Sequence, residues 1–268
     1  MFKLCALILL TLLASLASAD QKTNNAEIKQ PDFVGYAYDI GTNKLVYTEH
    51  HTYINTLFHE VHYKETNGEI FATKKIDYKH SYFAPDFVQE NSRNGEKIDI
   101  KRRSQRDDEN TIKYRIQYQE NSKERLEKET IRYSSRLIID AGFDHFIPQN
   151  WQALNDGKEL TIDYLIPSLQ DYYELTIKKE TCSAKNNSKL QDQRSSEFES
   201  EHCFSISASS FFIGLFSSQL ELTYGKKKDS EGNDRNNIKL VSFQGRSNIS
   251  DSEGNYQDVN IVYQYKES

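Results

Sequence analysis

The sequence predicts a mainly β protein, built as one large curved antiparallel sheet or an open half β-barrel, with one short amphipathic helix. Three observations favour this fold class. Aromatic residues make up 12% of the chain, and Tyr and Phe suit half-buried strands. Short segments alternate between apolar and polar residues along most of the chain. A central segment instead places its apolar residues at helical spacing.

The alternation is clearest in residues 111–118, where Ile and Tyr occupy one face of a strand and Lys, Arg and Gln occupy the other. A period of two with one polar face is typical of an antiparallel strand with one side in water. Gly41 and Asn43 supply turn residues between the first two strands. Further strands are expected at 34–38, 44–53, 58–64, 69–78, 97–101, 130–137, 160–166, 172–178, 203–209, 220–224, 237–244 and 259–265.

The central segment, residues 142–154, predicts the short helix. Its apolar residues recur at helical spacing and are Phe143, Phe146, Ile147, Trp151 and Leu154. Pro148 is expected in the first turn or at a kink, and Gly157 is expected to end the helix. We expect this helix to cover the concave face of the sheet or to plug one end of it.

Residues 1–19 have the pattern of a secretion signal. Lys3 supplies a positive charge, residues 4–13 are almost wholly apolar, and Ala19 ends a run of small residues that a signal peptidase reads. The apolar run is short for a membrane span, and no later segment approaches the roughly 20 apolar residues that such a span needs. We therefore expect an exported protein with no transmembrane segment after cleavage.

The mature chain is expected to have a flexible segment at residues 20–32 and a single β-rich domain at residues 33–268, because no linker composition or internal repeat divides it. Removing residues 1–19 takes away one Lys and no acid, so the formal charge moves from -6 to -7. The densest basic patch, residues 101–106, runs directly into the acidic residues 107–109. Nucleic-acid binding is therefore not expected, and the oligomeric state is left open.

Two cysteines remain after residues 1–19 are removed, Cys182 and Cys203. In an oxidising compartment such a pair predicts one disulfide, which would pin a polar loop at residues 183–202. Closing a loop of about 20 residues is worth roughly 3 kcal/mol in a chain-entropy model. The spacing differs from that of a Cys-x-x-Cys redox motif, which favours a structural role.

Several segments resemble a group of uncharacterised periplasmic proteins of Gram-negative bacteria. They are Gly35–Asp39, Lys44–His50, Asp140–Phe146, Trp151 and Leu165–Ser168. That group is similar in shape to envelope half-barrels such as the lipoprotein carriers of the Lol pathway. The resemblance implies an unclosed β-barrel with a hydrophobic concavity in the periplasm. A lipid or lipoprotein partner is a separate expectation, which rests on the export signal, the strand pattern and the apolar segments. It supplies no catalytic residue, because fold alone does not carry function.

Metal and nucleotide sites are not expected. His59 and His62 would lie on opposite faces of a strand, and the adjacent His50 and His51 diverge in the same way. No glycine-rich phosphate loop and no nucleophile elbow is present in the sequence. We therefore expect no cofactor, no metal and no enzymatic activity.

The acidic segment before Pro148 leaves an alternative open. Asp140, Asp144 and His145 would form an acid/base group for an envelope hydrolase if their side chains converged. The competing interpretation is that Asp144 caps the short helix while His145 lies half exposed.

The most apolar stretch of the mature chain is residues 209–216, and together with the helix it would line an apolar ligand pocket. The candidate lining residues are Phe143, Phe146, Trp151, Phe211, Phe212 and Phe216. The alternative is an ordinary packed core. The favoured function is thus a non-enzymatic envelope protein that binds a lipid or other apolar ligand. A hydrolase, or a structural or protein-binding factor without a ligand, are the two alternatives.

Overall fold

The computed structural model describes residues 30–103, 112–182, 198–208, 220–227 and 237–266, and the statements below concern these residues. The predicted signal peptide, most of the 20–32 segment and residues 209–216 lie outside them. In the described part of the chain, no helix has both the length and the apolar character needed to cross a membrane.

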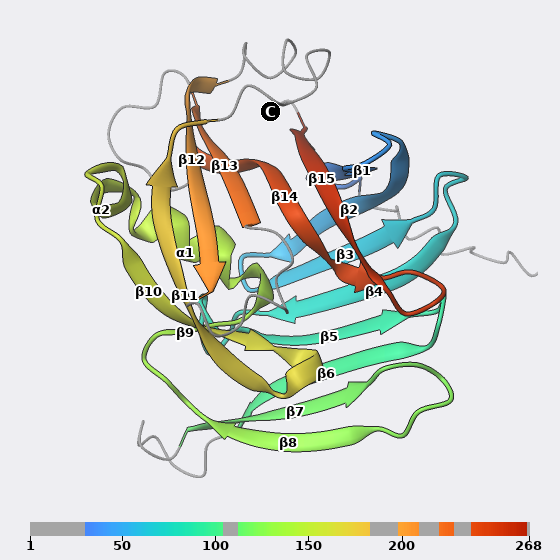
Figure 1. Cartoon of the computed structure of the whole chain (residues 1–268). Coiled ribbons are helices and arrows are strands. Elements are labelled where there is room, and N and C mark those ends of the chain that lie inside the picture. Colours follow the sequence, from blue (N-terminus) through green and yellow to red (C-terminus); the bar gives the residue numbers. More distant parts are fainter. Residues whose placement is uncertain (1–29, 104–111, 183–197, 209–219, 228–236, 267–268) are drawn as a thin grey trace, which may run out of the picture.

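The described residues form one open sheet of 15 strands that curves back toward itself (Figure 1), which confirms the predicted fold class. The strands are β1 (Phe33–Asp39), β2 (Leu45–Asn55), β3 (Phe58–Lys64), β4 (Ile70–Asp77), β5 (Asp86–Asn91), β6 (Glu96–Arg103), β7 (Lys113–Gln119), β8 (Glu127–Arg132), β9 (Leu137–Ile138), β10 (Leu160–Ile166), β11 (Asp171–Glu180), β12 (Phe198–Ala208), β13 (Leu220–Lys227), β14 (Ile238–Ser250) and β15 (Tyr256–Tyr265).

The strand order is β8-β7-β6-β5-β4-β3-β2-β1-β15-β14-β13-β12-β11-β10-β9. Two runs of consecutive antiparallel strands, β1–β8 and β10–β15, are therefore joined where β1 pairs with β15, with Phe33 opposite Tyr265. The short strand β9 pairs in parallel with β10. The two edge strands, β8 and β9, follow each other in sequence. The chain thus leaves one edge of the sheet and returns directly at the other.

Alternation along the strands decides which face is buried. In β7 every second residue, Tyr114, Ile116 and Tyr118, is buried, as the pattern predicts. One cluster of buried apolar residues lies mainly beneath β1–β8, and a second packs β10–β14 against the helices. Strands β5 and β9 were not predicted, and the strand expected at 130–137 is divided between β8 and β9.

In place of the expected single helix the structure has two short helices, α1 (Phe143–Gln149) and α2 (Trp151–Asn155). A 3-10 turn, η2 (Asp140–Gly142), precedes them. Pro148 lies within α1 and cannot donate a backbone hydrogen bond there. The Asn150 side chain then donates to the Phe146 carbonyl at 2.9 Å, and the helix stops at Asn150. Gly157, with φ +87°, follows α2 and ends the helical segment as predicted.

Gly142 fixes how this segment lies against the sheet. A Cβ at this position would lie 1.9 Å from the Phe83 carbonyl oxygen, so no larger residue fits without moving backbone. The Ile139 amide donates to the same oxygen at 3.0 Å. The start of α1 is therefore held tightly to the loop that precedes β5.

The predicted disulfide between Cys182 and Cys203 is present, with a Cα–Cα distance of 5.1 Å. Cys182 lies just after β11, and Cys203 pairs with Glu180 in the β11–β12 ladder. The polar loop is shorter than the predicted 183–202, because residues 198–202 belong to β12.

Replacing both cysteines by serine (C182S/C203S) should lower the free energy of unfolding by up to about 3 kcal/mol. The value of about 3 kcal/mol is an upper limit, because the β11–β12 ladder already holds the two ends of the loop together. Urea unfolding of the oxidised protein and of the double variant measures it. As a control, the wild-type protein in a thiol reductant should match the variant; an unchanged unfolding midpoint in both would contradict a stabilising bridge.

Candidate functional site

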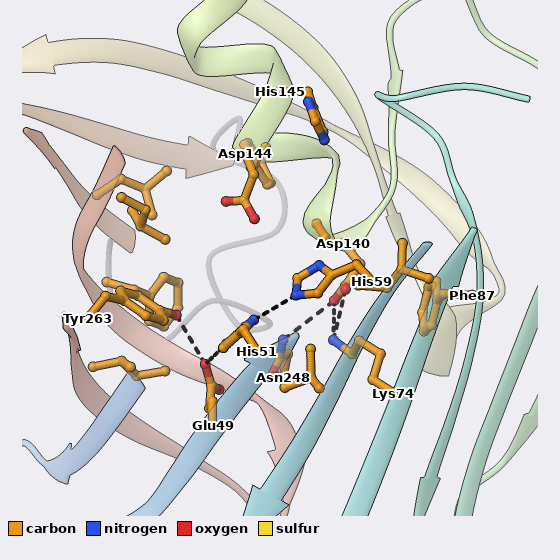
Figure 2. Close-up of a pocket in the computed structure, with 18 of the residues that line it drawn as sticks. Glu49, His51, His59, Lys74, Phe87, Asp140, Asp144, His145, Asn248 and Tyr263 are labelled. Atoms are coloured by element: carbon orange, nitrogen blue, oxygen red, sulfur yellow. Dashed lines mark hydrogen bonds and ion pairs between the residues drawn. The ribbon is translucent and has the colours of Figure 1, made fainter. Parts of the chain in front are cut away.

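A cavity of ≈ 1520 Å³ lies inside the bend of the sheet, and we call it the central cavity. Strands of both runs line it, together with η2 and α1. Its wall on β11–β14 is largely apolar, with Leu175, Ile206, Leu222, Leu240 and Phe243. Its wall on β2–β4 and η2 carries buried ionisable side chains, which Figure 2 shows facing the same space. The cavity therefore has an apolar part and a polar end.

An ion pair between Lys74 and Asp140 joins the sheet to η2 at the polar end. The Lys74 side chain on β4 is 2% exposed, and its Nζ lies 2.7 and 2.8 Å from the two carboxylate oxygens of Asp140. Asn248 donates to the same carboxylate at 3.4 Å. Asp140 has a φ of 43°, a left-handed conformation that Asp tolerates better than most residues.

Glu49, His51 and His59 form a chain of hydrogen bonds beside this ion pair (Figure 2). His51 Nε2 lies 3.3 Å from Glu49 Oε2, and His51 Nδ1 lies 3.1 Å from His59 Nε2. Tyr263 also donates to Glu49 Oε2, at 3.2 Å. Phe33 stacks on the His51 ring with centroids 4.1 Å apart. The three residues come from β2 and β3, whose alternation turns them toward the same side.

Burial determines the protonation states of these three hydrogen-bonded residues. It raises the pKa of Glu49 to about 7, against the opposing effect of the Lys74 charge. It lowers the pKa of His51 to about 3 and holds the pKa of His59 well below its usual value. Both imidazoles are therefore neutral near pH 7. The contact between Glu49 and His51 is accordingly a hydrogen bond to a neutral ring rather than an ion pair.

Asp144 lines the same cavity from the first turn of α1. Burial raises the pKa of its carboxyl to about 7, and the nearby Asp140 adds to the shift while Lys239 opposes it. The expected capping role is wrong. Gly142 is the N-cap residue, and no side chain caps the helix. Asp144 is the second residue of α1 and so lies two positions after the capping position.

The three residues of the hydrolase alternative do not converge. Asp140 is bonded to Lys74, while His145 packs edge-on against Tyr78 with centroids 4.8 Å apart. Figure 2 shows Asp144 and His145 leaving α1 in different directions. Within the described ranges, no hydrogen bond joins any two of Asp140, Asp144 and His145. The expected acid/base group is therefore not assembled in this structure.

Of the apolar pocket residues expected from the sequence, Phe143 lines the central cavity. Phe146 and Trp151 instead pack with the second core cluster; the Trp151 ring, for example, lies 5.8 Å from that of Phe204. Phe211, Phe212 and Phe216 lie outside the described residues. In the part of the chain that is described, no group of three or more His, Cys, Asp or Glu side chains is arranged to hold a metal ion.

Sequence reasoning missed the polar end of the cavity. The signal that could have found it is the β2–β3 hairpin, in which Tyr53 lies opposite His59. That register brings His51 and His59 to the same face, because every second residue of an antiparallel pair shares a side. His62 alternates to the other face of β3, as predicted.

No protein-family model matches the chain, and the comparison with curated proteins finds no match. Among solved structures, the chain is similar to a β-barrel-like protein of the domain of unknown function DUF1849 from Brucella abortus. The two are 7% identical, with a TM-score of 0.42, over 89% of this chain and 98% of the other. A likeness at this level carries no argument about function.

Replacing Lys74 by methionine (Lys74→Met) should lower the free energy of unfolding by about 3 to 5 kcal/mol, because it leaves the Asp140 carboxylate without its buried partner. Urea denaturation followed by far-UV circular dichroism measures the loss. Lys75→Met is the matched control. Its side chain is 70% exposed, and the change should stay within about 0.5 kcal/mol. Equal effects of the two substitutions would contradict the role assigned to the ion pair.

Replacing Glu49 by glutamine (Glu49→Gln) should make the stability difference from the wild type depend on pH. A folded pKa raised to about 7 means that the folded wild type holds a proton that the unfolded chain releases above about pH 4.5. The wild type therefore loses stability as pH rises from about 4.5 to 7, whereas glutamine does not titrate. The variant should gain about 1 to 3 kcal/mol relative to the wild type over this window, measured by urea unfolding at its two ends. A constant difference would contradict the raised pKa.

Proposed function

We propose that this chain is an exported, non-enzymatic envelope protein that holds a lipid or another amphipathic molecule in its central cavity. The observation that carries the proposal is the cavity of ≈ 1520 Å³ inside the bend of the sheet. Small-molecule sites measure roughly 300 to 1,000 Å³, so this volume has room for a long-chain ligand. As part of the same proposal, the protein acts in the periplasm and its ligand includes the acyl part of a lipoprotein. Residues 1–19 and the resemblance described above support this part of the proposal.

The apolar wall supplies the driving force for binding. Moving a CH₂ group out of water is worth about 0.8 kcal/mol, so a chain of about twelve carbons gains about 10 kcal/mol. Association costs about 4 kcal/mol or more. The remainder corresponds to a dissociation constant between millimolar and micromolar, which is adequate for a carrier that must release what it binds.

The shape of the sheet supports a reversible fit. The sheet is open, since β8 and β9 are its edges and do not pair with each other. An unclosed sheet can admit a long chain from the side without unfolding, whereas a closed barrel admits it only through an end.

The proposal is tested with a neutral naphthalene dye whose fluorescence rises in an apolar site. The wild-type protein should bind it with a micromolar dissociation constant, and native mass spectrometry of protein purified from an envelope fraction should show a co-purified lipid. Leu240→Trp fills the apolar part of the cavity and should weaken dye binding about tenfold, because it removes the space that the dye occupies.

Leu169→Trp is the control, since Leu169 is exposed and is not among the cavity-lining residues. It should bind the dye like the wild type. Absence of dye binding and of co-purified lipid in the wild type would overturn the proposal.

A further inference from the structure

The polar end of the central cavity contains a carboxylate that the fold does not use. Asp144 lines the cavity and makes no hydrogen bond to any other residue in the described ranges. It caps no helix. The charged groups that face it are Asp140, Glu49, Lys239 and Lys74. Lys74 is bonded to Asp140 through both carboxylate oxygens, so that lysine already has its counter-ion.

A second, independent feature lies in the lining of the same cavity. His59 is 1% exposed and lines the cavity, and its Nδ1 has no hydrogen-bond partner in the part of the chain that is described. A buried ring nitrogen without a partner costs free energy, so it marks a position where a ligand group is expected. Figure 2 shows Asp144 and the His51–His59 pair facing the same space.

The hydrogen-bond chain decides what His59 Nδ1 can bind. With Glu49 ionised, the N–H at His51 Nε2 donates to the Glu49 carboxylate, which leaves His51 Nδ1 as an acceptor. The N–H at His59 Nε2 must then donate to His51 Nδ1. A neutral imidazole has one N–H, so His59 Nδ1 is a lone-pair acceptor. The polar end therefore offers two acceptors to a ligand, the Asp144 carboxylate and His59 Nδ1.

The charges that line the polar end favour a cationic hydrogen-bond donor over a neutral one. This wall contains the carboxyls of Glu49, Asp140 and Asp144 and the fully buried amine of Lys74. The other basic residues of the lining are Lys227, Lys239, Arg246 and Lys266, of which Arg246 and Lys266 are exposed. A cationic donor placed at Asp144 gains a charge-assisted hydrogen bond, about twice as strong as a neutral one. An anionic group there would face carboxylates.

We propose that the polar end of the central cavity binds the primary ammonium group of an amphipathic amine, with Asp144 as its counter-ion and His59 Nδ1 as a second acceptor. The alkyl part of the amine then lies along the apolar wall of β11–β14. An ammonium group carries three N–H donors and no acceptor, which matches the two acceptors, the Asp144 carboxylate and His59 Nδ1. This inference rests on the proposed function, because it assigns the polar group of the same ligand.

The test compares three probes with the same chain and different head groups, dodecylammonium, dodecan-1-ol and dodecanoate. Each displaces the neutral naphthalene dye from the wild-type protein near pH 8 and below its micellar concentration. We expect dodecylammonium to bind about tenfold or more tightly than dodecan-1-ol, and dodecanoate to bind most weakly.

The outcomes separate this inference from the proposed function. Dodecanoate binding as tightly as dodecylammonium overturns the ammonium assignment, and so does equal binding of dodecylammonium and dodecan-1-ol; in both cases the apolar cavity still stands as a ligand site. Failure of the dye and of all three probes to bind overturns both proposals together.

Asp144→Asn keeps the size of the side chain and removes its charge. It should weaken dodecylammonium binding about tenfold and change dodecan-1-ol binding by no more than about twofold. Asp156→Asn is the matched control, because Asp156 is exposed just after α2 and bonds to Gln152 outside the cavity; it should leave both affinities unchanged. Undiminished dodecylammonium binding by folded Asp144→Asn would overturn the assignment.

The wild type provides a second measurement that needs no variant. Between about pH 5 and pH 8 the carboxyls of Asp144 and Glu49 ionise while an alkylammonium remains charged. Dodecylammonium affinity should therefore rise about tenfold across this range while dodecan-1-ol affinity stays level. An affinity for dodecylammonium that falls with rising pH contradicts the proposed counter-ion.

Discussion

The ion pair between Lys74 and Asp140 is the interaction on which the arrangement of the molecule depends. One open sheet cannot bury its own concave face, so another element must be fixed against it. Asp140 begins the only helical segment that the described residues place between β9 and β10, and Lys74 holds it to β4 at 2.7 Å. Gly142 adds a contact that no larger residue permits. Together these two contacts hold α1 at the wall of the cavity rather than in its middle.

The strand order explains why the cavity has two different ends. Each half of the sheet is a run of consecutive strands, and the two halves meet at the β1–β15 pair. The ionisable residues Glu49, His51 and Lys74 come from the first half, whereas the apolar wall comes from β11–β14 in the second half. Residues far apart in sequence therefore face each other across one space, and an amphipathic lining results from joining two runs of different composition.

The sequence predicted the fold class, most strands and the disulfide because these depend on local patterns. Alternation in residues 111–118 reports burial directly, and the two cysteines that remain after the predicted cleavage leave one pairing. The polar end of the cavity depends on strand register, which alternation does not supply. In sequence, His51 is paired with its neighbour His50 and His59 with His62, whereas the contact between His51 and His59 follows from the β2–β3 ladder. Strand β5 was not predicted because it begins and ends with polar residues, Asp86 and Asn91, and because the buried Gln89 interrupts its apolar face.

The buried ionisable cluster favours a ligand-binding role over a purely structural one. A buried charge or imidazole costs free energy that well-packed apolar residues of similar volume would not, and such costs are typical of functional sites. The Lys74–Asp140 pair has a structural use, since it fixes the helical segment. Asp144 has no comparable use, and His59, although its Nε2 bonds to His51, leaves its Nδ1 without a partner in the described residues. A ligand that bonds to both would offset the cost of burying them, and the free energy it regains is part of its own affinity.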